Sequence, residues 1–147
     1  MAIDRKRVLD IMTANPECVT ENSSIVDVAR IMKEEDTGVV PVVDGKKLLG
    51  IITDRDIVVR LVAEGKNLSD CKVSEAMTKD VRAVNEEGTV DEVLNVMHSA
   101  NVRRVPVVNR SNEIVGIVSM ADLAIETGEK TKVGDVVQDI SEARPNN

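Results

Sequence analysis

The strongest constraint on the fold of this chain is an internal duplication. Compared with itself at a shift of 65 residues, the segment from Val8 to Val43 has eleven identical pairs: Val8 with Val73, Met12 with Met77, Thr13 with Thr78, Val19 with Val84, Glu21 with Glu86, Val28 with Val93, Met32 with Met97, Val40 with Val105, Pro41 with Pro106, Val42 with Val107 and Val43 with Val108. One residue is inserted in the next turn, and at a shift of 66 Gly50, Ile51 and Asp56 match Gly116, Ile117 and Asp122. Fourteen identities in one register indicate two copies of one structural unit.

Both copies show the same predicted order of elements, β-α-β-β-α after a short helical start. Short runs rich in β-branched residues predict buried strands, and hydroxyl side chains before an apolar helix pattern predict N-caps. In the first copy the elements are a helical start at Val8–Met12, a strand at Cys18–Thr20, a helix capped by Ser24, hairpin strands at Gly38–Val43 and Leu48–Thr53, and a helix from Asp54. In the second they are Val73–Met77, Ala83–Asn85, a helix capped by Thr89, strands at Val102–Val108 and Ile114–Ser119, and a helix from Met120.

The central helix of each copy has one apolar face at the spacing i, i+3, i+4, i+7. These residues are Ile25, Val28, Ala29 and Met32 in the first copy and Val90, Val93, Leu94 and Met97 in the second. Such a face predicts packing against the core of the protein. Pro41 and Pro106 lie inside predicted strands, and because proline cannot donate to a strand ladder, we expect those strands to be edges or irregular.

The fold class predicted from these patterns is α/β (α+β), with one module at 1–64 and a second at 65–126. The connector Glu64-Gly65-Lys66-Asn67 is too short for a flexible linker, and we therefore expect the modules to pack directly on each other. The pattern Val133–Val137 echoes the start of both copies. Residues 127–147 are therefore expected to form a short helical cap followed by a disordered tail.

Composition excludes several classes of function. A net charge of −7 disfavours nucleic-acid binding, and the absence of Phe, Trp and Tyr removes any stacking platform for bases. A core without aromatic residues favours a homodimer that buries more surface. No apolar run reaches the ~18 residues that span a membrane, and the N-terminus does not resemble a signal peptide, which predicts a cytoplasmic protein. Cys18 and Cys71 form no metal or disulfide motif, and we expect both to be buried as small apolar residues.

Each copy ends its second hairpin strand with the same motif, Thr53-x-x-Asp56 and Ser119-x-x-Asp122. A hydroxyl residue followed three positions later by an acidic one matches a capping box, and an N-cap stabilises by about 1 kcal/mol. The same geometry suits a ligand. The free N–H groups of a helix N-terminus bind phosphate, and an Asp there can accept two hydrogen bonds from a ribose diol.

The paired V-P-V-V and G-[IV]-[IV]-[TS]-x-x-D motifs resemble a tandem of CBS domains, named after cystathionine β-synthase. The resemblance extends from about Val8 to Leu123, and over this length the chain is similar to stand-alone two-module proteins of bacteria and archaea. It implies a pseudo-twofold pair, called a Bateman module, whose sheets pack together around two clefts. In relatives the clefts bind AMP, ADP, ATP, S-adenosylmethionine or NAD, and two pairs commonly form a flat dimer of four modules.

The resemblance also implies roles for particular residues. The hydroxyls of Thr53 and Ser119 would meet phosphate or ribose, and Asp56 and Asp122 would hold the ribose hydroxyls. The remaining residues expected around a ligand are Arg103 and Arg104 at the phosphates, Arg55 beside the first site, Thr37, Val39 and Val102 around the base, and Thr13 and Thr78, with Met12 and Met77, near its edge. The positions that match Arg103 and Arg104 are Gly38 and Val39, which predicts that the second copy binds a phosphorylated ligand better.

Two hypotheses for function remain open at this stage. The first is a regulatory module that senses an adenosine-containing ligand and passes the signal to an unidentified effector protein, with no required cofactor. The second is a ligand-free interaction or stress protein in which both motifs are helix caps. Catalysis is not expected, because no nucleophile, metal cluster or positioned base is apparent, and the single histidine, His98, fits a helix surface.

Overall fold

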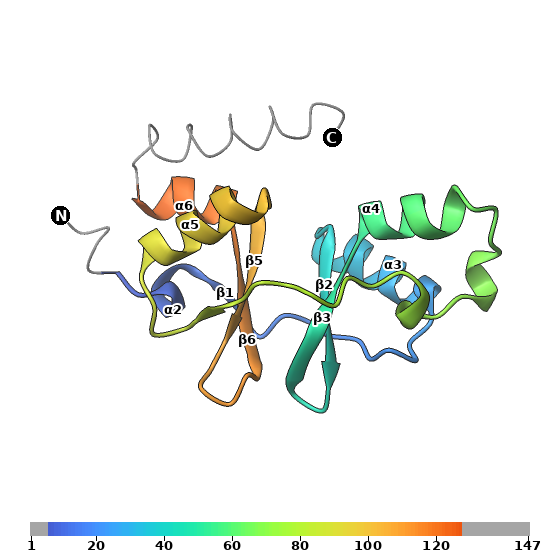
Figure 1. Cartoon of the computed structure of the whole chain (residues 1–147), viewed down its shortest axis with the longest axis horizontal. Coiled ribbons are helices and arrows are strands. Elements are labelled where there is room, and N and C mark those ends of the chain that lie inside the picture. Colours follow the sequence, from blue (N-terminus) through green and yellow to red (C-terminus); the bar gives the residue numbers. More distant parts are fainter. Residues whose placement is uncertain (1–5, 128–147) are drawn as a thin grey trace. The chain divides into compact units, whose positions relative to one another are not determined.

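The computed structural model describes residues 6–127, and the predicted cap and tail over 127–147 lie almost wholly outside this range. The described residues form two compact units (Figure 1). Unit 1 contains residues 6–15, 82–111 and 115–127, and unit 2 contains residues 16–81 and 112–114. Both units mix helices with strands, which confirms the predicted α/β (α+β) class. The expected packing of one copy on the other stays a prediction.

Unit 2 is built around a β-hairpin. Strands β2 (Val39–Asp44) and β3 (Lys47–Thr53) pair antiparallel, with a bulge between Val42 and Val43. The predicted hairpin is therefore confirmed, and the strand that contains Pro41 is irregular as expected. The other elements are helix α3 (Ile25–Glu35), helix α4 (Asp54–Ile57), the π-helical turn η1 (Val58–Val62) and the 3₁₀ turns η2 (Leu68–Asp70) and η3 (Val73–Glu75).

Unit 1 holds a four-stranded sheet in the order β1-β6-β5-β4. Strand β1 runs antiparallel to β6, and β4 runs parallel to β5. In both units the helices lie on one side of the strands (Figure 1). The elements of unit 1 are α2 (Val8–Ile11), β1 (Thr13–Ala14), β4 (Val84–Asn85), α5 (Val90–Ala100), β5 (Arg104–Val108), β6 (Ile114–Ser119, from Val115 onward in this unit) and α6 (Met120–Thr127).

The two copies exchange their opening segments between the compact units. Thr13 of the first copy pairs with Ile117 in β6, and its repeat partner Thr78 pairs in the same way with Ile51 in β3. The first residues of each predicted module, 1–64 and 65–126, therefore belong to the compact unit that contains the hairpin of the other module. The repeats are units of sequence, and the compact units combine a hairpin from one repeat with the opening segment of the other.

The central helices are capped as the sequence predicts. Ser24 accepts a hydrogen bond from the backbone N–H of Asp27 at 3.1 Å, and Thr89 accepts one from Glu92 at 3.2 Å. Both helices end at a residue in the left-handed conformation, Asp36 in α3 and Asn101 in α5. Such residues satisfy the terminal carbonyls of a helix, and therefore the duplication preserves both ends of this element.

Each unit has its own apolar core, and one predicted core residue is misplaced. All four predicted residues of α5 are buried, but in α3 Ala29 is exposed, Met32 is only half-buried, and Ile31 takes part in the core. Position 29 matches Leu94, which is 4% exposed. Both lie at the margin of the helix face, where a leucine is long enough to reach the core and a single methyl group is not.

The two cysteines also differ. Cys71 is 5% exposed, whereas Cys18 is only half-buried, which corrects the expectation that both would be buried. Burial raises the pKa of the Cys18 thiol, and the neighbouring Glu17 carboxylate raises it further. No helix within residues 6–127 has the length and apolar character needed to cross a membrane.

Candidate functional site

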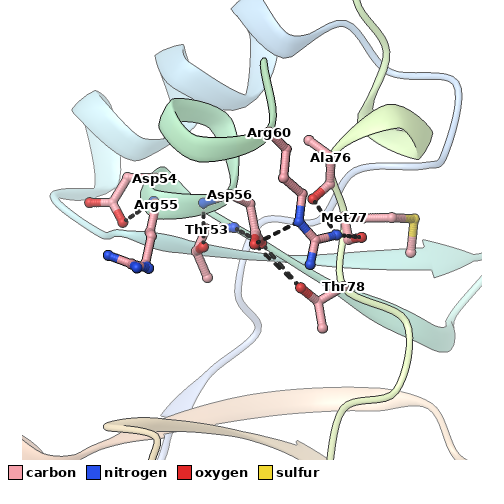
Figure 2. Close-up of polar contacts among 8 residues, drawn as sticks. All are labelled: Thr53, Asp54, Arg55, Asp56, Arg60, Ala76, Met77 and Thr78. Carbon is pink, nitrogen blue, oxygen red and sulfur yellow. Dashed lines mark hydrogen bonds and ion pairs between the residues drawn. The ribbon is translucent and has the colours of Figure 1, made fainter. Parts of the chain in front are cut away.

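The first motif lies where β3 ends and α4 begins, and it forms a complete capping box. The Thr53 hydroxyl accepts a hydrogen bond from the backbone N–H of Asp56 at 3.0 Å. In return, the backbone N–H of Thr53 donates to Oδ2 of Asp56 at 3.0 Å. These bonds hold the Asp56 carboxylate against the first turn of the helix (Figure 2).

The second motif, between β6 and α6, repeats this geometry. The backbone N–H of Ser119 donates to Oδ2 of Asp122 at 2.9 Å, and the backbone N–H of Asp122 donates to the Ser119 hydroxyl at 3.1 Å. The capping-box interpretation is therefore confirmed in both copies. Because a carboxylate has more acceptor sites than a cap requires, the box leaves room for a ligand contact. The predicted ribose contact stays a prediction.

The two carboxylates differ in what else they contact. The Thr78 hydroxyl lies 3.4 Å from each carboxylate oxygen of Asp56. Arg60 Nε lies 3.8 Å from Oδ1 of Asp56, whose side chain is only 13% exposed. Asp122 has no comparable neighbour: beyond its capping box, it makes no further hydrogen bond or ion pair with the described part of the chain.

Arg60 belongs to this cluster and is not among the site residues predicted from the sequence. Its Nη1 donates to the backbone carbonyl of Met77 at 3.0 Å and, less closely, to that of Ala76 at 3.4 Å (Figure 2). The i, i+4 spacing from Asp56 could have suggested the ion pair, because such residues are neighbours on a helix. The contact with the carbonyls has no sequence signal, because it joins residues far apart in the chain.

In unit 2 the remaining predicted residues surround the first motif. Val39 is the strand partner of Thr53, and the Thr37 hydroxyl bonds both backbone groups of Val39, at 3.2 and 3.3 Å. Arg55 is exposed on the first turn of α4 (Figure 2). The structure therefore places Thr37, Val39, Thr53, Arg55, Asp56 and Thr78 together in unit 2, around the start of β2 and the end of β3.

In unit 1 the second motif has two arginines next to it. The carbonyl of Arg103 accepts a hydrogen bond from the backbone N–H of Met120 at 2.9 Å, which places Arg103 and Arg104 beside the first turn of α6. Both are exposed, and the Arg104 side chain makes no hydrogen bond or ion pair with the described side chains, those of residues 6–124, or with the described backbone. Val102 packs against the core of the unit, and Thr13 is exposed in β1. Residues Thr13, Val102, Arg103, Arg104, Ser119 and Asp122 therefore share unit 1.

Other features of the described residues do not point to a second kind of site. Residues 6–127 contain no group of three His, Cys, Asp or Glu residues that could hold a metal ion. His98 is exposed in the last turn of α5, as expected. An open hollow of about 340 Å³ in unit 1 is lined by Asn85, Glu86, Glu87, Asn109, Arg110 and Ser111, none of which belongs to the predicted site.

Comparison with known proteins gives consistent matches. The family model of the CBS domain matches residues 8–63 and 73–127. The uncharacterized protein YlbB of Bacillus subtilis (strain 168) is 38% identical over 138 residues, covering 92% of each chain. Hypoxic response protein 1 of Mycobacterium tuberculosis (strain ATCC 25618 / H37Rv) is 38% identical over 116 residues, 78% of this chain and 80% of that protein.

Two solved structures resemble the chain closely. Hypoxic Response Protein I, crystallised with two coordinated zinc ions, has a TM-score of 0.76 and 36% identity over 82% of this chain and 98% of its own. The CBS domain pair of protein MJ0100, in complex with 5′-methylthioadenosine and S-adenosyl-L-methionine, has a TM-score of 0.75 and 34% identity over 85% of this chain and 98% of its own.

Proposed function

The chain belongs to the CBS domain family, and on that premise we propose that it is a regulatory module that binds an adenosine-containing ligand. The candidates are AMP, ADP, ATP, NAD and S-adenosylmethionine, and the module performs no catalysis. Binding acts by stabilising one conformation over another, because a ligand shifts an equilibrium only through its different affinities for the two states. The signal then passes to an effector protein.

The observation that supports this proposal most directly is the set of hydrogen bonds that the Asp122 carboxylate accepts. One of its carboxylate oxygens accepts the capping bond from Ser119, and the other accepts none from the described residues. A carboxylate oxygen with free lone pairs at the start of a helix can accept the hydrogen bonds of a ribose diol. The similarity to the MJ0100 pair, which binds two adenosyl compounds, supports the same ligand class.

The neighbouring arginines favour a phosphorylated ligand in this copy. Arg103 and Arg104 lie beside the N-terminus of α6, where the N–H groups and helix dipole also favour an anion. A guanidinium binds phosphate through two parallel hydrogen bonds. We therefore expect AMP, ADP or ATP to bind the second copy more tightly than S-adenosylmethionine, whose sulfonium group is positively charged.

Thermal unfolding in the presence of each candidate ligand tests the proposal. A ligand at 100 times its dissociation constant stabilises the folded state by about 2.7 kcal/mol, which raises the melting temperature of a chain of this size by several degrees. The matched variant is Asp122→Asn, because the asparagine carbonyl can still accept the capping bond from Ser119 but lacks the charge and the second acceptor. We expect the ligand to raise the melting temperature of the wild-type protein but not that of Asp122→Asn. Without ligand, the melting temperature of Asp122→Asn should differ little from that of the wild-type protein.

A second function is supported by the capping boxes themselves. Since both motifs form complete capping boxes, they do not require a ligand to explain them. In that case the protein is a ligand-free interaction module, and none of the five candidates changes the melting temperature. Asp122→Asn would then cause a small loss of stability and nothing else.

We also propose that the chain forms a homodimer. Unit 2 exposes four valines, Val26 on α3 and Val58, Val59 and Val62 on η1, with exposed fractions of 44%, 55%, 48% and 50%. A core without aromatic residues supplies less buried area per side chain, and a second copy would bury these valines as well.

A further inference from the structure

The two Asp residues of the repeated motif are equivalent in sequence but not in their surroundings. Oδ2 of Asp56 accepts from the backbone of Thr53, and the Thr78 hydroxyl lies 3.4 Å from both carboxylate oxygens. Arg60 Nε adds a positive charge 3.8 Å from Oδ1. Both oxygens of Asp56 therefore have neighbours within the protein, and the side chain is mostly shielded from solvent.

Arg60 connects this carboxylate to a distant segment of the chain. Its guanidinium contacts Asp56 on one side and the carbonyls of Ala76 and Met77 on the other (Figure 2). The segment Ala76–Thr78 is the opening segment of the second copy, and it lies against β3 through the pair Thr78 and Ile51. Arg60, Asp56 and Thr78 thus join α4 and η1 to a segment that the sequence assigns to the other repeat.

The described residues around the second motif do not repeat this arrangement. At the shift of 66, the position that matches Arg60 is Glu126, whose carboxylate cannot donate to a carbonyl. Thr13, which matches Thr78, is exposed, and its hydroxyl makes no hydrogen bond with the described residues. Among the described side chains, only the motif carboxylate of the first copy is paired with an arginine and with a threonine hydroxyl.

We propose that Asp56, Arg60 and Thr78 form a latch that fastens the exchanged segment Ala76–Thr78 to α4, and that ribose recognition therefore depends on Asp122. The second half of this proposal rests on the proposed function. A ribose at Asp56 would compete with the Thr78 hydroxyl and with the attraction of Arg60, whereas a ribose at Asp122 meets a carboxylate oxygen that accepts no hydrogen bond from the described residues. Arg60 acts as a positioning residue, because it sets the availability of Asp56.

Hydrogen exchange tests the latch without any ligand. The backbone N–H of Thr78 donates to Ile51 at 2.8 Å, and that of Ile51 donates to Thr78 at 3.0 Å, so these two amides report the attachment of the segment. Arg60→Met keeps an unbranched apolar side chain in place of the arginine stem and removes its charge and donors. We expect faster exchange of both amides in Arg60→Met and in Asp56→Asn, by about tenfold or more if a hydrogen bond to a charged group is lost.

The matched control is Arg82→Met, because Arg82 is exposed and makes no hydrogen bond or ion pair with the described residues. It should leave the exchange of Thr78 and Ile51 unchanged. The latch proposal is contradicted if these two amides exchange their hydrogens at the wild-type rate in both Arg60→Met and Asp56→Asn.

Calorimetric titration with AMP and with 5′-methylthioadenosine tests the assignment of the ribose. Asp122→Asn should weaken binding by about tenfold or more, the effect of losing a hydrogen bond to a charged group, while Asp56→Asn should leave the affinity of that site within a factor of about three. Equal losses in the two variants overturn the assignment. Absence of binding to the wild-type protein overturns the ribose assignment together with the proposed function. The hydrogen-exchange rates of Thr78 and Ile51 then still test whether the latch exists.

Discussion

The carbonyl oxygen of Thr78 occupies the space that a β-carbon on Gly50 would need. The repeat partner Gly116 faces the same restriction, since a β-carbon there would lie 2.5 Å from the sulfur of Met12 and 3.0 Å from the carbonyl oxygen of Thr13. In each unit the glycine of the repeated motif therefore admits the opening segment of the other copy. A residue that looks like part of a ligand motif is required by packing.

Replacement of either glycine by alanine should destabilise the protein. The added methyl group of Gly50→Ala or Gly116→Ala has to push a neighbouring segment away, and overpacking of this kind costs about 1–3 kcal/mol. Urea unfolding followed by circular dichroism measures the loss. Gly45→Asn is the control, because Gly45 has nothing within 4 Å of a β-carbon and asparagine tolerates its left-handed conformation. Loss of stability in the control equal to that in Gly50→Ala would contradict the packing explanation.

Removal of a cap hydroxyl should weaken the central helix of a copy. Thr89→Ala loses the acceptor for the backbone N–H of Glu92, at a cost of about 1 kcal/mol in the free energy of unfolding. Thr89→Ser keeps the hydroxyl and should unfold at nearly the wild-type denaturant concentration. The interpretation of Thr89 as a cap is refuted if the serine and alanine variants are equally unstable.

Charged residues on η1 should dissociate the proposed homodimer. Val58→Lys or Val62→Lys places an ammonium group where a second copy would bury a valine, and burial of an unpaired charge is strongly unfavourable. Sedimentation velocity should then show a monomer, with the circular dichroism spectrum unchanged. Glu34→Gln is the control, because it changes the net charge of the protein by the same amount at an exposed position on α3. It should leave the wild-type assembly intact. A wild-type protein that sediments as a monomer would refute the dimer.

The Cys18 thiol should titrate at higher pH in the folded protein than in the unfolded one. Burial, reinforced by Glu17, favours the neutral thiol and raises its pKa. The rate of labelling by a thiol reagent should therefore rise at higher pH in the folded Cys71→Ser variant than in the same variant unfolded in urea. The contribution of Cys18 to the stability of the folded protein is therefore complete below the unfolded-state pKa and is lost as the pH rises through the folded-state pKa. Coincident labelling curves would show that the burial has no effect on the thiol.

Local features of this protein could be predicted from its sequence. The duplication follows from comparing the sequence with itself, and the two hairpins, the caps at Ser24 and Thr89 and the two capping boxes each depend on residues close together in the chain. Their side chains bond backbone groups about three positions away, or they repeat with the period of a strand or a helix. For this reason the motif that marks the candidate site can also be recognised from the sequence alone.

The tertiary structure decided the features that join distant parts of the chain. The exchange of the opening segments, the fit of Thr78 against Gly50 and the contact of Arg60 with Met77 depend on the path of the backbone, which no local period records. The exposure of Ala29 was also a matter of packing, because the same helix position is buried when it carries Leu94. The sequence thus determined that two like motifs exist, and the folded chain made them different by giving Asp56 contacts with Arg60 and Thr78 that the described residues do not provide for Asp122.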